Sequence, residues 1–337
     1  MKKKVLILKN DRGGDLLNSI KSISSLLNIS NDVTIFLSPF NHGFSFLFKK
    51  ALVKKINYNL NIFNKIYLFF FVFKNNFDEI YILAPKNFYF FLPFIFRKIK
   101  FFGVTVNSFK RYRPNTYLRK FLFKFIVINR KNINKKSSSD MQLELINDNT
   151  LIDASYKNLD LPYLEDHIST HIPNNYLLVQ FKETFFEKID LLDDNFIYFL
   201  NEINKKFKNI VLFSDIENTS SNRFFIENFN FINCDTKEVY FKSKNPNIIY
   251  LHKVNAENLF SLVEKSNNIL CPHGLLTHMA RFYKKKNLNL FNFIIQDKSD
   301  LKHQKIAFSE WYKNMNIKFT FLNNNKAKTI KKILKNL

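Results

Sequence analysis

A carboxylate that follows two glycines is the first candidate for chemistry in this sequence. Asp15 comes directly after Gly13 and Gly14, which are two of only 5 glycines in the chain. Glycine permits backbone conformations with positive φ and lets a ligand approach the main chain closely. A carboxylate at such a turn can accept the proton of a hydroxyl group placed beside it. Asp15 is therefore a candidate general base; the competing interpretation is a residue that only complements a helix N-terminus.

A second turn of this kind lies in the other half of the chain, at His273-Gly274-Leu275-Leu276-Thr277-His278. An apolar run precedes the turn, and a helical pattern follows it. The first amide groups of a helix are free donors at the positive end of its dipole, and they suit a phosphate group. We expect a charged ligand held between the two turns. The alternative is two ordinary tight turns.

The elements that must position these turns alternate between strand and helix patterns. The expected strands cover residues 5–8, 33–37, 78–83, 101–106, 176–179, 210–213, 248–251, 268–271 and 288–295. The expected helices cover residues 16–27, 44–53, 88–98, 194–206, 223–228, 256–265, 277–283 and 326–337, while residues 65–73 fit either element. Such alternation predicts parallel sheets covered by helices on both faces.

The length of 337 residues suits two domains of ordinary size. Residues 147–175 have little periodicity, and we place the linker there. We therefore predict two doubly wound α/β domains, residues 1–160 and 161–337, that face a central cleft. The basic helix at the end of the chain is expected to pack back on the first domain.

The chain carries a formal net charge of +24, from 52 Lys and Arg against 28 Asp and Glu. Such a surplus favours an anionic partner, such as nucleic acid, an acidic membrane surface or a phosphorylated substrate. Lys, Asn, Ile and Phe all have AT-rich codons, so base composition explains part of the surplus. No helix-turn-helix, zinc-finger or RNA-recognition signature is present, and we expect no nucleic-acid partner.

Basic residues are densest between Lys110 and Lys136, where aromatic residues interleave them. This stretch is either a solvated face or a surface for an acidic, lipid-linked acceptor or an anionic inner leaflet. We expect its aromatic residues to pack beneath a helix.

The two cysteines, Cys234 and Cys271, fit no metal-ligand or redox spacing. The apolar run after the N-terminal lysines is too short for a signal peptide. The other apolar runs are shorter than the ~20 residues that a spanning helix needs. We expect a cytoplasmic protein, with peripheral contact to the inner membrane as an option, and neither a metal ion nor a cofactor.

Three motifs together resemble those of the heptosyltransferases of lipopolysaccharide core assembly, glycosyltransferase family 9. The first is a strand, a Lys, a short loop and Gly-Asp, met here by Lys9, Gly14 and Asp15. The second is Asp-Thr-Gly-x-x-His before a helix, met in part by His273–His278. The third is a strand followed by a Thr and, four residues later, a Lys, met by Thr184 and Lys188. The similarity in element order covers nearly the whole chain.

The resemblance implies a GT-B fold of two Rossmann-like domains and an inverting transfer of a sugar, with ADP-heptose as the first choice of donor. It assigns Asp15 as the general base. The acceptor side would comprise Lys9, Gly13, Gly14, Arg111 and Arg113. The donor side would comprise Thr184, Lys188, Glu217, His273, Gly274, Leu275, Thr277 and His278. The acceptor would be a lipopolysaccharide core or another surface glycan.

The second motif departs from the family pattern. His273 stands where the family has Asp, and Gly274 lies one place earlier than the family Gly. This leaves open a family-9 transferase with a different sugar and acceptor, and an inactive GT-B binding module. A non-catalytic basic protein that binds nucleic acid is the alternative from another class.

Overall fold

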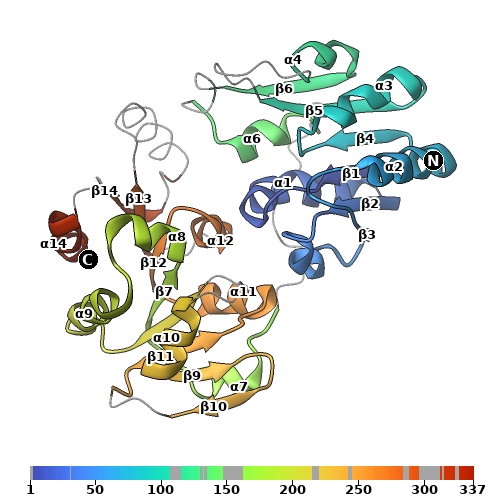
Figure 1. The fold of residues 1–337 in the computed structure, drawn as a ribbon. Helices are drawn as coiled ribbons and strands as arrows, with labels where there is room; N and C mark the ends of the chain where they lie inside the picture. Colours follow the sequence, from blue (N-terminus) through green and yellow to red (C-terminus); the bar gives the residue numbers. More distant parts are fainter. Residues whose placement is uncertain are drawn as a thin grey trace. The chain divides into compact units, whose positions relative to one another are not determined.

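The computed structural model describes residues 3–30, 32–106, 115–129, 132, 135–146, 162–214, 220–241, 245–283, 288–295, 312, 315–322 and 326–337. These residues form two compact α/β units (Figure 1). Unit 1 contains the described residues between Lys3 and Ile146, and unit 2 contains those from Pro162 to Leu337. The domain boundary expected at residues 160–161 lies outside the described residues.

Unit 1 is built on a parallel sheet of six strands in the order β3-β2-β1-β4-β5-β6. The strands are β1 (Lys4–Lys9), β2 (Asp32–Leu37), β3 (Leu52–Lys55), β4 (Glu79–Ile82), β5 (Lys100–Val106) and β6 (Lys124–Ile128). The chain adds strands on one side of β1 and then returns to add β4 on the other side. The topological switch point, where open α/β sheets bind ligands, therefore lies between β1 and β4.

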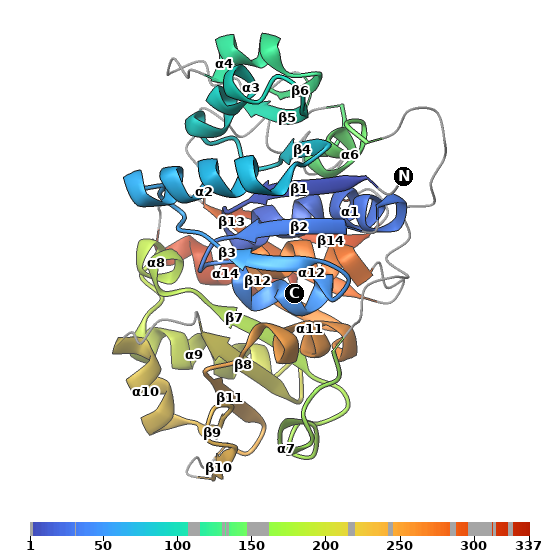
Figure 2. The same ribbon diagram turned by 90° about the vertical axis from the view of Figure 1, so that its right-hand side faces the viewer.

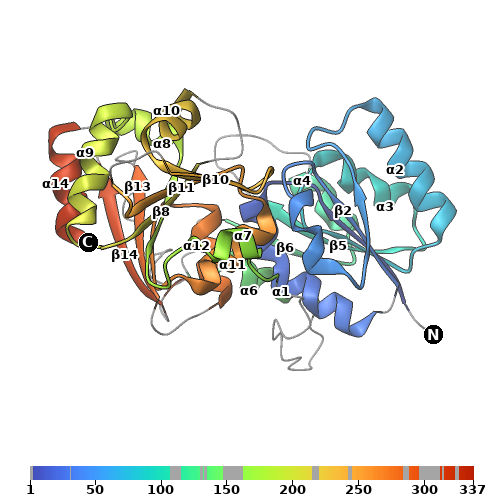
Figure 3. The ribbon, with the colours of Figure 1, turned by 90° about the horizontal axis from the view of Figure 1, so that it is seen from below.

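Helices cover both faces of this sheet, as Figure 3 shows. On one face α1 (Gly13–Ile29) packs against α6 (Ser138–Leu143). On the other face lie α2 (Ile62–Asn75) and α3 (Leu92–Ile95). Shorter pieces complete the unit: η1 (His42–Phe48), η2 (Asn87–Phe91), α4 (Asn115–Leu118) and η3 (Arg119–Phe121). The inner side of α2 contributes Leu68 and Val72 to the core beneath it.

Unit 2 has a sheet of eight strands in the order β10-β9-β11-β8-β7-β12-β13-β14. The strands are β7 (Leu177–Phe181), β8 (Ile210–Ser214), β9 (Asn230–Asn233), β10 (Glu238–Tyr240), β11 (Ile248–His252), β12 (Asn268–Pro272), β13 (Asn289–Ile295) and β14 (Asn316–Leu322). All neighbouring strands pair in parallel except β9 and β10. The direction of strand addition reverses between β7 and β12, which is the switch point of this unit.

The helices of unit 2 are α7 (Asp166–Ser169), α8 (Glu183–Phe186), η5 (Glu187–Ile189), α9 (Asp193–Asn204), α10 (Ser220–Asn228), α11 (Ala256–Lys265), α12 (Leu275–Tyr283) and α14 (Lys326–Asn336). Aromatic residues form much of the core: Phe181 stacks on Phe186 with ring centroids 5.0 Å apart and meets Phe196 edge-on at 4.7 Å. The abundant phenylalanine of the sequence thus fills a real interior here.

Most expected elements are confirmed within a few residues, and the doubly wound plan of each half is confirmed. Residues 65–73, which fit either element, belong to helix α2. The helix expected at residues 44–53 is wrong, because the 3-10 helix η1 ends at Phe48 and the strand β3 begins at Leu52. The strands β6, β9, β10 and β14 were not predicted.

Two expectations about chain organisation are also corrected. Residues 162–175 are not a linker, because Leu164 and Ile168 are buried and Ser261 donates a hydrogen bond to the carbonyl of Pro162. The terminal helix α14 packs within unit 2. Its Ile333 is fully buried in the core of that unit, and Lys206 at the end of α9 donates to the Leu334 carbonyl.

Within the described residues, no helix combines the length and the apolar character needed to cross a bilayer.

Candidate functional site

Asp15 lies at the switch point of unit 1, in the first turn of α1 after β1. Its side chain is exposed, and the residue that caps the helix, Arg12, makes no side-chain cap hydrogen bond. The main-chain carbonyl of Asp15 accepts a hydrogen bond from the Ser19 hydroxyl at 3.3 Å, one turn further along α1. The carboxylate faces solvent beside a helix N-terminus, where negative charge is favourable.

Gly13 and Gly14 are the first two residues of α1 and are half-buried. No described glycine has a positive φ. These glycines therefore do not serve an unusual backbone conformation. They leave the first two positions of α1 without side chains, which favours the approach of a ligand to the amide groups beside Asp15.

Lys9 is turned inward, although the sequence assigned it to the acceptor. It is 2% exposed, and its Nζ donates to Asp11 Oδ2 at 2.6 Å and to the Leu83 carbonyl at 3.2 Å. Because Leu83 follows β4, these contacts join the two strands that flank the switch point. Lys9 is the partner of Asp11 in this structure, and its place on the acceptor side stays a prediction.

Asp11 is a functional candidate that the sequence argument missed. Burial raises the pKa of its carboxyl group to about 6, against the lowering effect of Lys9, and the nearby charge of Asp15 raises this pKa further. Lys86, which follows β4, also lowers the pKa of Asp11. Burial lowers the pKa of Lys86, while Asp11 and Asp15 raise it. Two carboxylates and two ammonium groups thus meet at one switch point, where Lys9 and Asp11 are largely buried and Asp15 is exposed.

Amide and hydroxyl groups hold this turn in place. Ser38 donates to the Asp11 carbonyl at 2.5 Å, and Asn41 donates to the Lys9 carbonyl at 2.8 Å. Tyr89 donates to Asn10 Oδ1 at 2.8 Å, and Asn10 donates to the Asn57 carbonyl at 2.8 Å. Residues after three different strands, β2, β3 and β4, therefore fix the loop that carries Asp11 and Asp15.

The second candidate turn lies at the switch point of unit 2, between β12 and α12. Thr277 organises it: its Oγ1 accepts from the Gly274 amide at 3.3 Å and from Asn292 Nδ2 at 2.8 Å. Asn292 on β13 also contacts His273, with its Oδ1 3.2 Å from His273 Nδ1. Asn292 was not predicted, since nothing in its sequence surroundings signals contact with this turn.

Both histidines of the turn are held neutral. Burial lowers the pKa of His273 to about 4 and that of His278 to about 3. The hydroxyl of Tyr312 lies 3.4 Å from His278 Nδ1. At neutral pH these imidazoles can therefore donate or accept hydrogen bonds but bring no positive charge to a phosphate.

Gly274 and Leu275 line the exposed side of this turn and are half-buried. A Cβ atom added to Gly274 would meet no other atom within 4 Å. There is thus open space at the backbone where α12 begins, and the first amide groups of that helix have no partner within the helix. This is the local geometry that a phosphate group requires.

Thr184 and Lys188 belong to the same edge of the sheet. They follow β7, in α8 and η5, and both side chains are exposed. Because β7 pairs in parallel with β12, the carboxyl ends of the two strands meet, and the structure brings Thr184 and Lys188 to the edge where α12 begins. Lys188 is an exposed cation at this edge of the sheet.

Three predicted site residues lie outside the described residues: Arg111 and Arg113 on the acceptor side and Glu217 on the donor side. Among the residues that the structure describes, no group of three or more His, Cys, Asp or Glu side chains is placed to hold a metal ion.

Comparison with known proteins finds no matching family model and no matching curated protein. The fold, in contrast, is similar to solved structures over nearly the whole chain. The ADP-heptose lipopolysaccharide heptosyltransferase II of E. coli matches with a TM-score of 0.62 and 12% identity, covering 99% of this chain and 97% of its own. An E. coli heptosyltransferase solved with ADP matches with a TM-score of 0.61 and 11% identity, with 98% of each chain covered.

A protein of Listeria monocytogenes designated a UDP-N-acetylglucosamine 2-epimerase also matches, with a TM-score of 0.57 and 11% identity. The match covers 100% of this chain and 89% of that one. These likenesses confirm the predicted fold, two Rossmann-like domains of the GT-B type. Transferases and an epimerase share it, so the chemistry must be argued from the site.

Proposed function

We propose that this chain is a glycosyltransferase of the heptosyltransferase type. It transfers a sugar from a nucleoside diphosphate to a hydroxyl group of a glycan. The observation that carries the proposal is that each candidate turn lies at the switch point of its own sheet. One turn presents an exposed carboxylate, and the other presents a helix N-terminus beside open space. A base and a diphosphate site are the two parts that such a transfer needs.

In this proposal unit 1 binds the acceptor, and Asp15 takes the proton of the attacking hydroxyl group. The oxygen forms a bond to the anomeric carbon as the bond from that carbon to the diphosphate oxygen breaks. The displacement inverts the anomeric centre. The proton ends on Asp15, and the electron pair leaves with the nucleoside diphosphate.

The leaving diphosphate gains negative charge, which unit 2 must stabilise. The amide groups at the start of α12 and the ammonium group of Lys188 are the proposed donors, with the Thr184 hydroxyl as an additional contact. Thr277 holds the Gly274 amide in place by the hydrogen bond described above. His273 and His278, which are neutral, are proposed to contact the donor by hydrogen bonds, and Glu217 is proposed to contact the nucleoside.

The Lys9–Asp11 pair has a positioning role in this scheme. It joins the turn after β1 to the end of β4, and the charge of Asp11 raises the pKa of Lys86 while that of Lys9 lowers it. In this scheme Asp15 acts beside charges that balance one another, the carboxylate of Asp11 and the ammonium groups of Lys9 and Lys86.

The donor proposed first is ADP-heptose, because two of the similar structures carry heptosyltransferase and ADP in their names. The acceptor proposed is an anionic, lipid-linked glycan such as a lipopolysaccharide core, with peripheral contact to the inner membrane. We propose a cytoplasmic location and no nucleic-acid partner. A family-9-like transfer of another sugar is the alternative, and His273 in place of the family Asp is the feature that favours it.

The test is acceptor-dependent release of nucleoside diphosphate from ADP-, GDP- and UDP-sugars, with a glycolipid extract as acceptor. The proposal expects release from one donor only when acceptor is present, and a product linkage of inverted anomeric configuration. Retention of configuration, or isomerisation of the donor sugar without transfer, would contradict it.

A further inference from the structure

Helix α2 of unit 1 is apolar on both of its sides. Its inner side buries Leu68 and Val72, as expected for a helix on a sheet. On its outer side Phe63, Phe70 and Phe73 are 76%, 61% and 67% exposed. The outer side of a surface helix in a globular protein is normally polar. Large exposed aromatic side chains grouped on one helix side mark a surface that contacts something else.

The apolar surface continues beyond α2. Figures 1 and 2 show α3 between α2 and α4. Phe69 of α2 contacts Phe96 after α3, with ring centroids 5.3 Å apart, and Phe94 of α3 contacts Phe121 of η3 at 4.0 Å. Phe94 and Phe121 are themselves exposed, as is Ile95. We call the surface formed by Phe63, Phe70, Phe73, Phe94, Ile95 and Phe121 the aromatic face.

This finding corrects one expectation. The aromatic residues of the basic stretch 110–136 were expected to pack beneath a helix, but Tyr117, Phe121, Phe123 and Phe125 are exposed. They lie on or between short elements, α4, η3 and β6, instead of one long helix.

Most of the charge around the aromatic face is positive. No Asp or Glu occurs between Glu79 and Asp140, so every charged residue of that stretch is Lys or Arg. Lys74 at the end of α2, and Arg97 and Lys98 after α3, lie beside the aromatic side chains. Lys120 lies over the Phe121 ring at 5.2 Å.

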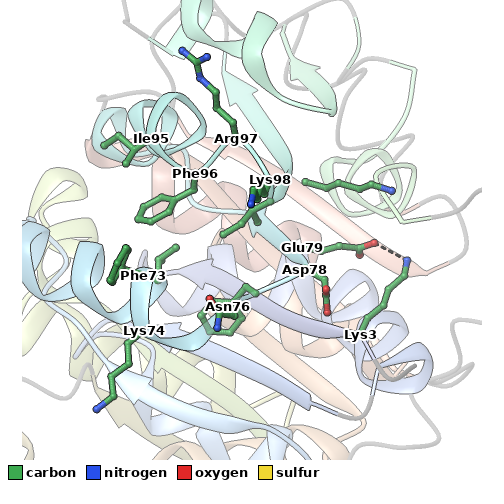
Figure 4. A pocket seen from close by; sticks show the side chains of 14 residues that line it. Lys3, Phe73, Lys74, Asn76, Asp78, Glu79, Ile95, Phe96, Arg97 and Lys98 are labelled. Atoms are coloured by element: carbon green, nitrogen blue, oxygen red, sulfur yellow. Dashed lines mark hydrogen bonds and ion pairs between the residues drawn. The ribbon is translucent and has the colours of Figure 1, made fainter.

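A pocket of about 1080 Å³ opens at the end of this face, where α2 ends and β5 begins (Figure 4). Phe73, Ile95 and Phe96 line it, with Arg97 and Lys98 beside them. Its two carboxylates are engaged: Glu79 pairs with Lys3 at 2.6 Å, and Asp78 accepts from the Lys4 amide at 2.7 Å. The pocket lies at the amino ends of β1, β4 and β5, at the edge of the sheet opposite the candidate site.

We propose that the aromatic face binds the surface of an anionic phospholipid bilayer. The aromatic side chains would enter the boundary between head groups and acyl chains, while the surrounding Lys and Arg contact lipid phosphates. Grouped aromatic residues with a basic margin are what interfacial binding requires. A second copy of the chain fits less well, because a symmetric contact through this face would bring the same cations together.

The direction of α2 places one end of the aromatic face toward the edge of the sheet that carries Asp15. A crossover helix runs antiparallel to the strands that it joins, so α2 begins near the carboxyl edge of the sheet. Its first residues thus lie toward the edge that carries Asp15. Membrane binding by this face would bring the candidate site close to a lipid-linked acceptor. Only this link to the acceptor rests on the proposed function.

The test is flotation of the full chain with vesicles of phosphatidylcholine, alone or mixed with phosphatidylglycerol. We expect binding to the mixed vesicles and little to phosphatidylcholine alone. The double variant Phe63→Ser/Phe70→Ser should lower the vesicle partition coefficient at least about tenfold. The matched control is Tyr198→Ser/Phe241→Ser, which removes two exposed aromatic side chains of unit 2 and should bind as the wild type does.

Arg97→Glu/Lys98→Glu provides a second variant and should weaken binding to the anionic vesicles alone. Thermal unfolding of each variant checks that it is folded. Equal binding by the wild type and Phe63→Ser/Phe70→Ser, or an equal loss in the control, would overturn the inference. So would a change from dimer to monomer in the Phe variant with vesicle binding intact, which would assign the face to a second copy. Nucleotide binding by the same samples reports separately on the proposed function.

Discussion

Asp11 and Asp15 are two carboxylates of one turn with opposite surroundings. Asp11 is almost enclosed and paired with Lys9, whereas Asp15 is exposed in the first turn of α1. A base must touch the hydroxyl group that it deprotonates, and that requirement favours Asp15. Asp11 lies behind it and sets the charge of its surroundings. Sequence spacing singled out Asp15 but missed Asp11, because the contacts that surround Asp11 come from Ser38 and Asn41, which lie on another segment.

Asp15→Asn should lower kcat by about 100-fold or more, since a positioned base contributes about 10² to 10⁴ in rate. Because the side chain is exposed, the melting temperature should change little. Steady-state kinetics and nucleotide binding on the same preparation would check this. Asp32→Asn is the matched control, as Asp32 is an exposed carboxylate of unit 1 away from the switch point. Unchanged turnover in Asp15→Asn would remove the proposed base.

Asp11 gives a prediction about pH. Its pKa is raised in the fold from 3.8 to about 6, so between these values the folded chain holds a proton that the unfolded chain has lost. The free energy of unfolding should therefore fall as pH rises from about 4 to about 6, by up to about 3 kcal/mol, because a pKa difference of one corresponds to about 1.4 kcal/mol. Asp11→Asn should lack this component.

Urea unfolding of wild type and Asp11→Asn at several pH values would measure the component as the difference between the two curves. Because asparagine is neutral like the protonated carboxyl group, the variant should gain stability relative to the wild type as pH rises from about 4 to about 6. Parallel curves for the two proteins across this pH range would show that Asp11 does not titrate as described.

At the scale of elements, alternation and periodicity predicted most of the fold, because each strand of a doubly wound sheet is a short apolar run. The predictions failed where context decides. Leu52–Lys55 becomes β3 only because it pairs with β2, and its own sequence is half polar. Asn316–Leu322 alternates between polar and apolar residues, and it becomes β14 by pairing in parallel with β13. Asn292 could not be predicted as a residue of the site. Its contacts with Thr277 and His273 form only because β13 lies beside β12 in the sheet.

Thr277→Val tests the start of α12. The change keeps the shape of the side chain but removes the oxygen that accepts from the Gly274 amide and from Asn292. Two buried or half-buried donors lose their acceptor, so the free energy of unfolding should fall by about 1 to 3 kcal/mol. Nucleoside diphosphate affinity should fall as well.

Chemical unfolding and calorimetric titration would measure these two effects. Thr236→Val, which removes an exposed hydroxyl group of unit 2, is the control and should change neither quantity by much. Full nucleotide affinity in Thr277→Val would show that this hydroxyl group does not organise the donor site.

At the scale of the whole molecule, two units repeat one plan, a doubly wound sheet with a switch point beside its first strand. Each has its switch point beside its first strand, β1 or β7, and each carries a candidate turn there. Unit 1 adds the aromatic face, which was not predicted, because the exposure of apolar side chains on the outer side of α2 is visible only in the fold. The composition showed the excess of positive charge, and the structure places some of these Lys and Arg residues around the aromatic face.

The most direct test of the account is binding of nucleoside diphosphates to unit 2, measured as a thermal shift of the full chain with ADP, GDP and UDP. A ligand that binds the native state raises its stability by mass action. We predict a shift with one of the three. We also predict that Gly274→Ala has an unchanged melting temperature without ligand, because the added methyl group meets open space, but weakens binding about tenfold where the phosphate approaches. No shift with any nucleotide, or equal binding by Gly274→Ala, would contradict the account.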